Sequence, residues 1–341
     1  GRMSYELSDM GGGDGAAQQV ANPTADGAVR SSRSLDFEPE PEPSGGVDVP
    51  EPMMQPEVLC GETTQIIGVD ENSPVAWSAD ALLLAFAARD YGIYIATRTE
   101  TGFTLATTLI GSRSSIKKLA FHPRRRLLVS ANEQGIKLWA VYVDPGSSNN
   151  PSNQCRLVHS LGLDSTVRTH DAAVETVEWL FDGAFLATGS KDNSVKIWQL
   201  QEVGSSPEDC RLRYMETLDS HKASVLALAF SAVNDLLASC GRDSVIKVWN
   251  CDTLKGEALA RRADDSGVTL QLVQNLEGHR GDVVSVAWSE TGNTLVSGAR
   301  DNTIKIWSPY GSECLRTLKA HKGDVHGLAM VPGGLLWSAA T

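Results

Sequence analysis

The chain has 341 residues, 41% of them hydrophobic, and a formal net charge of −12 at pH 7. It is long enough to bury a large core, and no apolar run approaches the ~18 residues that a membrane-spanning helix needs. Six widely spaced cysteines form no C-x-x-C pair, and we expect free thiols, no metal site and no disulfide scaffold.

Residues 1–57 carry most of the negative charge, with eleven acidic and three basic residues. Stretches such as GGGDGAA and FEPEPEPSGG are rich in Gly and Pro and poor in apolar residues. Such a segment cannot bury enough surface to offset the entropy of ordering. We therefore predict a disordered acidic arm over 1–57, followed by one folded domain over 58–341. The first residues lack the order of a secretory signal, which favours an intracellular protein, cytoplasmic or nuclear.

From residue 59 onward, short β-branched runs alternate with turn residues, and a pattern repeats. Three segments match best: residues 169–198, 220–249 and 278–307. In each, a histidine precedes a tryptophan by 28 residues, an aspartate lies six before the tryptophan, and a hydroxyl residue lies four before the aspartate. Two weaker copies precede them, over 73–96 and 114–139, with Gly111 at the histidine position of the second. An incomplete copy follows and stops at Thr341.

Each copy alternates apolar and polar residues with a period of two, which indicates four short antiparallel strands. In the best copy these are VVSVAW, TLVSGA and TIKIW, with a fourth strand such as LQLVQNL or CLRTL before the next histidine. One such sheet cannot bury both faces alone, so neighbouring sheets must stack.

These features resemble the WD-repeat (WD40) β-propeller family, in the Gly278-His279 opening, the Ser/Thr-x-x-x-Asp turn and the terminal IKIW strand. The resemblance covers roughly residues 60–341. It implies an all-β propeller of four-stranded blades, with about five complete blades and a truncated sixth, as in a fragment of a seven-bladed propeller. It also implies that the repeated residues form hydrogen-bonded tetrads: His170, Thr188, Asp192, Trp198; His221, Ser239, Asp243, Trp249; and His279, Ser297, Asp301, Trp307.

Serine, histidine and aspartate together raise the alternative of a hydrolase, but a catalytic triad is needed once, at one cleft. Here the arrangement recurs in three repeats, and motifs for phosphate loops, dinucleotides or zinc proteases are missing from the sequence. We therefore expect no catalytic residues, no cofactor and no small-molecule substrate. The predicted function is a protein-interaction scaffold, a subunit of a multiprotein complex.

In the resembled family, ligands on the narrow face often meet the residues before the turn aspartate and after the histidine. Here these positions carry six cations, which predict a preference for acidic or phosphorylated peptides: Lys191, Lys222, Arg242, Arg280, Arg300 and Lys322. Solvated turn charges remain the simpler interpretation. Three long connections link third and fourth strands, at 143–154, 201–209 and 251–268. They are either further candidate partner contacts or solvated loops without a binding role.

An RNA-associated propeller is the alternative function, with the basic run Arg124, Arg125 and Arg126 as its contact. This run falls in a predicted turn, and the domain as a whole is net negative, which is a weak electrostatic footprint for nucleic acid. Surface turn and RNA contact both stay open at this stage.

Overall fold

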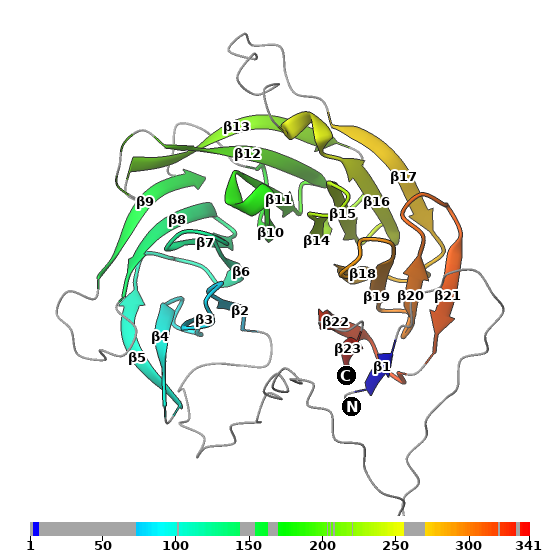
Figure 1. The fold of residues 1–341 in the computed structure, drawn as a ribbon, viewed down its shortest axis with the longest axis horizontal. Coiled ribbons are helices and arrows are strands. Elements are labelled where there is room, and N and C mark those ends of the chain that lie inside the picture. The colour runs from blue at the N-terminus through cyan, green and yellow to red at the C-terminus, as the bar shows by residue number, and fades with distance from the viewer. Residues whose placement is uncertain are drawn as a thin grey trace, which may run out of the picture. The chain divides into compact units, whose positions relative to one another are not determined.

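The computed structural model shows six antiparallel sheets that follow one another around a common centre (Figure 1). It describes residues 3–6, 73–100, 102–143, 154–162, 170–202, 204, 206, 209–219, 221–255, 270–319, 321–331 and 335–341. All of these belong to one compact unit made of residues 1–7 and 61–341.

Five sheets have four strands each, in chain order from the inside to the outside. The first holds β2 (Val75–Trp77), β3 (Leu83–Ala87), β4 (Ile93–Thr99) and β5 (Gly102–Leu109). The second holds β6 (Ile116–Phe121), β7 (Leu127–Asn132), β8 (Gly135–Tyr142) and β9 (Gln154–Gly162). The third holds β10 (Val174–Leu180), β11 (Phe185–Ser190), β12 (Ser194–Glu202) and β13 (Cys210–Asp219), with the 3-10 turn η1 (Phe181–Gly183) between its first two strands.

The fourth sheet holds β14 (Val225–Ser231), β15 (Leu236–Gly241), β16 (Val245–Asn250) and β17 (Gln271–Glu277), with the 3-10 turn η3 (Asp252–Leu254) after β16. The fifth holds β18 (Val283–Trp288), β19 (Leu295–Ala299), β20 (Ile304–Trp307) and β21 (Cys314–Leu318). These strands coincide with the predicted ones to within a residue or two. The predicted all-β WD40 propeller class, with five complete blades and a partial sixth, is confirmed.

The sixth sheet has three strands, in the order β1-β23-β22. Its own repeat supplies β22 (Val325–Val331) and β23 (Leu335–Ala340), and β1 (Met3–Glu6) pairs antiparallel with β23. This pairing occupies an edge that would otherwise present unpaired backbone groups. The sequence pattern did not predict β1, and the rest of the predicted arm over 1–57 lies outside the described residues.

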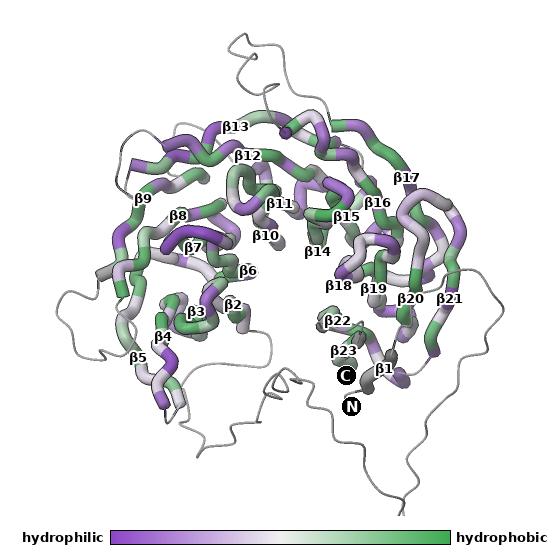
Figure 2. The backbone as a smooth tube through the Cα atoms, in the orientation of Figure 1, coloured by the Kyte–Doolittle hydropathy of each residue, from purple (hydrophilic) through white to green (hydrophobic). Residues whose placement is uncertain are grey.

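Hydrophobic packing joins each sheet to the next. Five clusters of buried residues each contain side chains from two successive sheets, from the first and second to the fifth and sixth. Trp198 and Trp307, the last residues of their VKIW and IKIW motifs, are at most 1% exposed. Figure 2 shows hydrophobic residues within the sheets and hydrophilic residues at many turns. Stacking therefore buries both faces of a sheet that could not be stable alone.

The first sheet differs because one of its faces is open among the described residues. Trp77 on β2 is 51% exposed, whereas the residues at the same register in the third and fifth sheets, Trp179 and Trp288, are 9% and 8% exposed. Those two tryptophans pack on the preceding sheet. Trp77 instead contacts Phe103 of its own sheet edge to face, with ring centroids 5.4 Å apart.

Candidate functional site

The third sheet brings together the four side chains of its predicted tetrad. The indole Nε1 of Trp198 donates to Oγ1 of Thr188 at 3.0 Å, and this oxygen lies 2.7 Å from Nε2 of His170. Nδ1 of His170 lies 2.8 Å from a carboxylate oxygen of Asp192. The result is a continuous hydrogen-bonded chain from the buried strand β12 to the turn between β11 and β12.

The fourth and fifth sheets repeat this geometry to within about 0.2 Å. In the fourth, the three distances along the chain from Trp249 to Ser239, His221 and Asp243 are 2.9, 2.8 and 2.8 Å. In the fifth, the chain of Trp307, Ser297, His279 and Asp301 has distances of 2.8, 2.7 and 2.9 Å. The three arrangements lie in three different sheets, so they do not converge on one cleft.

Each tetrad aspartate also shapes its turn. The carboxylate accepts the backbone N–H of the residue after the histidine, as in Asp301 with Arg280 at 2.8 Å. Its other oxygen accepts the N–H two residues ahead, as in Asp301 with Thr303 at 3.0 Å. The residue in between is left-handed, with φ of 63° at Asn302, a conformation that Asn tolerates well. The aspartate therefore fixes the turn that follows the second strand.

Proton positions in the tetrad follow from its two ends. An ionised carboxylate can only accept, so Nδ1 of His279 carries a proton and donates it to Asp301. In a neutral imidazole Nε2 is then an acceptor, so Ser297 donates its hydroxyl proton to Nε2 and accepts from the indole N–H of Trp307. Burial lowers the pKa of His279, against the raising effect of Asp301. Burial acts to raise the pKa of Asp301, but hydrogen bonds from Thr303, a backbone N–H and His279 bring it to about 2. A neutral imidazole against an ionised carboxylate fits both directions.

The second and sixth sheets hold partial versions. In the second, Trp139 donates to Ser130 at 2.9 Å, and Asn132 donates to Ser112 at 2.7 Å. Gly111 lies against the indole of Trp139 as Gly278 lies against Trp307, so Ser112, not Gly111, holds the histidine position. Counting along the repeat was off by one because the turn between β7 and β8 is one residue shorter. In the sixth, Nε2 of His321 lies 2.7 Å from Oγ of Ser338.

The six cations of the predicted rim are all exposed, but three of them have acidic partners. Lys191 lies 3.2 Å from Glu175. Arg300 and Arg242, from the fifth and fourth sheets, both approach Asp282, at 3.3 and 3.9 Å. Exposed pairs of this kind contribute little to stability, but they reduce the positive charge that a ligand would meet.

The other three rim cations form a separate set. Lys222, Arg280 and Lys322 each follow the histidine of their repeat, in three successive sheets, and none makes an ion pair with a described residue. We call these three residues the free rim set. The sequence predicts that Asp282 and Asp324 partly cancel the positive charge of the rim, and the structure shows that Asp282 does so at Arg242 and Arg300.

The basic run of the second sheet is bound within the protein. Arg124 pairs with Asp182, and Arg125 pairs with Glu202. Arg126 donates to the carbonyl of Val143 at 2.6 Å. Each arginine therefore has a partner on a neighbouring turn or strand. These contacts reduce the positive charge that the run would offer to RNA.

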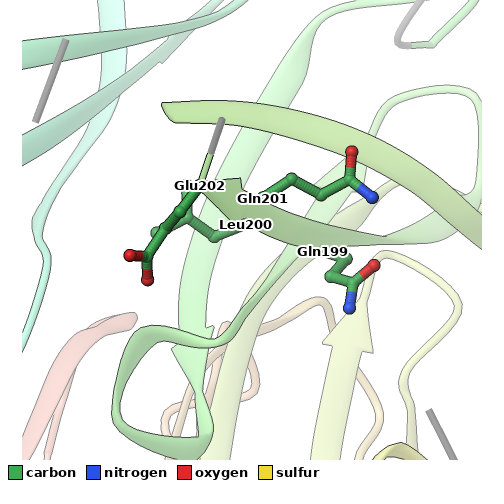
Figure 3. A pocket seen from close by; sticks show the side chains of 4 residues that line it. All are labelled: Gln199, Leu200, Gln201 and Glu202. Atoms are coloured by element: carbon green, nitrogen blue, oxygen red, sulfur yellow. The ribbon is translucent and has the colours of Figure 1, made fainter. Parts of the chain in front are cut away.

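A shallow pocket lies at the end of β12, lined by Gln199, Leu200, Gln201 and Glu202 (Figure 3). The side chains of Gln201 and Glu202 point away from each other, and Arg125 already binds Glu202. The pocket gathers no convergent polar groups. Much of the three long connections, including 144–153 and 256–269, lies outside the described residues, so their predicted partner contacts stay predictions.

Sequence reasoning missed Glu178 on β10, the innermost strand of the third sheet. An alignment of the innermost strands of all repeats would have marked it, because the other repeats carry alanine at this position. That comparison needs the strand register, because the repeats differ in turn length.

Comparison with known proteins agrees with the geometry. Four segments match the family described as WD domain, G-beta repeat: residues 103–140, 161–199, 212–250 and 270–308. Protein HIR1 of Cryptococcus neoformans var. neoformans serotype D (strain JEC21 / ATCC MYA-565) is 34% identical over 156 residues, which are 45% of this chain and 18% of that protein. A component of chromatin assembly factor 1 from Mus musculus is 29% identical over 155 residues, which are 44% of this chain and 27% of that protein.

A third relative is the probable cytosolic iron-sulfur protein assembly protein 1 of Vanderwaltozyma polyspora, 31% identical over 152 residues, or 43% of each chain. The chain thus spans less than half the length of each of these three relatives. Among the described residues, no helix is long and apolar enough to cross a bilayer. Sheets of this topology, tetrads of this geometry and four matched repeats together make the chain a member of the WD-repeat β-propeller family.

Proposed function

We propose that the protein is a non-catalytic interaction scaffold, one component of a multiprotein assembly. The observation that supports this proposal is that Ser/Thr, His and Asp side chains form the same buried hydrogen-bonded links in three successive sheets. Groups whose hydrogen bonds are satisfied inside a sheet stabilise it and are not free to act on a substrate. The printed name of one relative, a component of a chromatin assembly factor, supports a role within an assembly. The names of the relatives support a nuclear or cytoplasmic location inside the cell.

The ligand class that we propose is an acidic or phosphorylated peptide bound on the histidine-bearing face. The free rim set places on each of three successive sheets one cation that makes no ion pair with a described residue. Guanidinium and ammonium groups bind carboxylate and phosphate oxygens through charge-assisted hydrogen bonds. Arg242 and Arg300 would contribute less, because Asp282 already partly neutralises both.

The test is fluorescence anisotropy with a labelled peptide that carries two phosphoserines, against its unphosphorylated form. The variant K222E/R280E/K322E reverses the free rim set. The matched control, R211E/R213E/R316E, makes the same charge change at exposed positions on the outer strands β13 and β21. We expect at least a tenfold loss of phosphopeptide affinity in the first variant and less than threefold in the second. Equal losses would mean that only net charge matters and would refute a site on this face.

The scaffold proposal has its own test. Serine-reactive fluorophosphonate labelling of the folded protein should give no stoichiometric labelling of Ser239 or Ser297, because both hydroxyls are fully buried. Stoichiometric labelling of either serine in the folded state would revive the hydrolase alternative.

A further inference from the structure

The outermost strands of successive sheets are joined by a hydrogen bond that recurs at one register. In the second to fifth sheets, one residue of the outermost strand pairs with the tryptophan of the third strand: Leu157, Tyr214, Leu272 and Cys314. The side chain two positions after this residue accepts the backbone N–H of the residue two positions before its counterpart in the next sheet. We call this bond the outer link. It joins His159 to Leu212, Glu216 to Leu270 and Gln274 to Ser312.

The three outer links differ in the chemistry of the acceptor. In chain order, the donor-to-acceptor distances are 3.1, 2.9 and 3.2 Å. Gln274 accepts through its amide oxygen, in the orientation that gives both of its amide groups a partner. An amide does not titrate, whereas a histidine side chain ordinarily gains its proton near pH 6.5. Among the three, only the link from His159 depends on a group that becomes positively charged in acid.

A second histidine of the second sheet lies at the inner side of the same seam. Nδ1 of His122, in the turn between β6 and β7, accepts the N–H groups of Arg124 and Arg125, both at 3.0 Å. Its ring lies edge to face against the indole of Trp179 in the third sheet, with centroids 4.8 Å apart. That indole donates to the carbonyl of Ala120 in the second sheet at 3.4 Å. The seam between the second and third sheets thus has a histidine at both its inner and its outer side.

The seam between the fourth and fifth sheets has the same construction without a histidine. The indole of Trp288, at the register of Trp179, donates to the carbonyl of Ala229 in the fourth sheet at 3.0 Å. The fourth sheet carries Ser231 at the register of His122, and Gln274 provides the outer link. This seam is therefore a matched reference within the same chain.

The surroundings of both histidines favour the neutral imidazole. Burial, followed by the charge of Arg125, lowers the pKa of His122 to about 4, against the raising effect of the nearby carboxylates of the third sheet. Burial, followed by the charge of Arg211, lowers the pKa of His159. Neither histidine forms an ion pair with a carboxylate of a described residue.

The titratable groups on the surrounding elements are as follows. Around His159, β5 carries none, and those of β9 itself, β8 and β13 are Cys155, Arg156, Lys137, Tyr142, Cys210, Arg211, Arg213, Tyr214, Glu216 and Asp219. Around His122, β7 carries none, and those of its own turn, β6, β10, η1 and the end of β12 are Arg124, Arg125, Arg126, Lys117, Lys118, Glu175, Glu178, Asp182 and Glu202.

We propose that the seam between the second and third sheets is an acid-sensitive joint, which loosens when His122 and His159 gain protons and can no longer accept hydrogen bonds at Nδ1. A protonated imidazole carries an N–H on both ring nitrogens and has no acceptor. Leu212 is 5% exposed, so its N–H would be left without a partner in a place that water does not readily reach. At the inner side, the N–H groups of Arg124 and Arg125 would face a donor.

The direction of the effect agrees with the lowered pKa values. The open form of the seam, with ordinary histidine pKa values near 6.5, binds these protons more tightly than the closed form does. The contribution of both histidines to the closed seam is therefore complete above about pH 6.5 and is lost as the pH falls, for His122 through about 4.

Hydrogen exchange of the full chain at pH 7.0 and pH 4.5, corrected for intrinsic exchange, tests the proposal. The measured sites are the Leu212 amide and the Trp179 indole N–H, each relative to the Trp288 indole N–H, which also reports any general loss of stability in acid. We expect relative protection at pH 4.5 to fall at least threefold for Leu212. We expect at least a tenfold fall for Trp179, because the pKa of His122 changes from about 4 to 6.5 when the seam opens.

Two variants assign the response to its histidines. His159→Gln copies the acceptor of the fourth sheet and should make the relative protection of Leu212 constant within twofold, while Trp179 still responds to pH. His122→Asn keeps an oxygen that can accept the N–H two residues ahead, and it should remove the response of Trp179 alone. His159→Ala, which has no acceptor, should give low protection of Leu212 at both pH values. Equal falls at all three sites in the native protein, or responses that persist in both non-titrating variants, would overturn the proposal.

Discussion

Thr188→Val removes the central oxygen of the third tetrad while keeping the shape of the side chain. Thr188 is fully buried, and its Oγ1 contacts Nε1 of Trp198 at 3.0 Å and Nε2 of His170 at 2.7 Å. Valine leaves both nitrogens without this partner. A buried polar group that loses its partner costs ~1–3 kcal/mol. We expect the free energy of unfolding to fall by about 2–4 kcal/mol, as the sum over two such groups with partial relaxation.

The measurement is equilibrium urea unfolding of the full chain, followed by circular dichroism and tryptophan fluorescence. The control is Thr188→Ser, which retains the hydroxyl as in the fourth and fifth sheets, where Ser239 and Ser297 occupy this position. It removes one methyl group, at a cost of about 1 kcal/mol. If the serine variant is destabilised as much as the valine variant, packing of the methyl group and not the hydrogen-bonded chain holds the sheet, and the structural role of the tetrads is refuted.

Three further predictions concern single positions. Gly183→Ala should lower the melting temperature markedly, because Gly183 has a φ of 96° and a Cβ there would lie 2.1 Å from the ring of His122; a thermal scan with an unchanged midpoint would contradict this. The protein should lose stability in acid, first below about pH 6.5, where the unfolded chain protonates His279 more readily than the folded protein with its lowered pKa does, and then from about pH 3.8 toward pH 2, where the unfolded chain protonates Asp301 first. Asp301→Asn should make urea midpoints less dependent on pH below 4, and an identical dependence would argue against the ionised pair. Cys240 is buried and its pKa is raised, so maleimide should label it only after unfolding, as mass spectrometry can check.

Local periodicity was enough to predict the strands and to mark the recurring histidine, hydroxyl, aspartate and tryptophan residues, and the resemblance to the WD-repeat family implied that these residues form tetrads. The apolar positions of VVSVAW and TIKIW supply buried residues to the core, and β18 and β20 lie within one residue of these segments. The tetrads could be predicted because all four members lie within one repeat at constant spacing. Where a turn was one residue shorter, the same counting assigned Gly111 to a position that Ser112 holds.

The repeat pattern does not predict which charged side chains pair across sheets. Arg242 and Arg300 both approach Asp282, although Arg242 lies in another sheet 40 residues away in sequence. Arg124 and Arg125 likewise bind acidic residues more than 50 positions away. A repeat period specifies which residues share a position within each sheet. It does not specify which side chains of two adjacent sheets lie within hydrogen-bonding reach.

The amino-acid sequence by itself determined the four-stranded sheets and the recurring side chains that link each sheet internally, since these depend on contacts within one repeat. Only the tertiary structure decided that β1 pairs with β23, and which rim cations form ion pairs with described residues of their own or a neighbouring sheet. Those contacts depend on how successive sheets stack in space, and stacking is set by the summed packing of many side chains and not by any local motif.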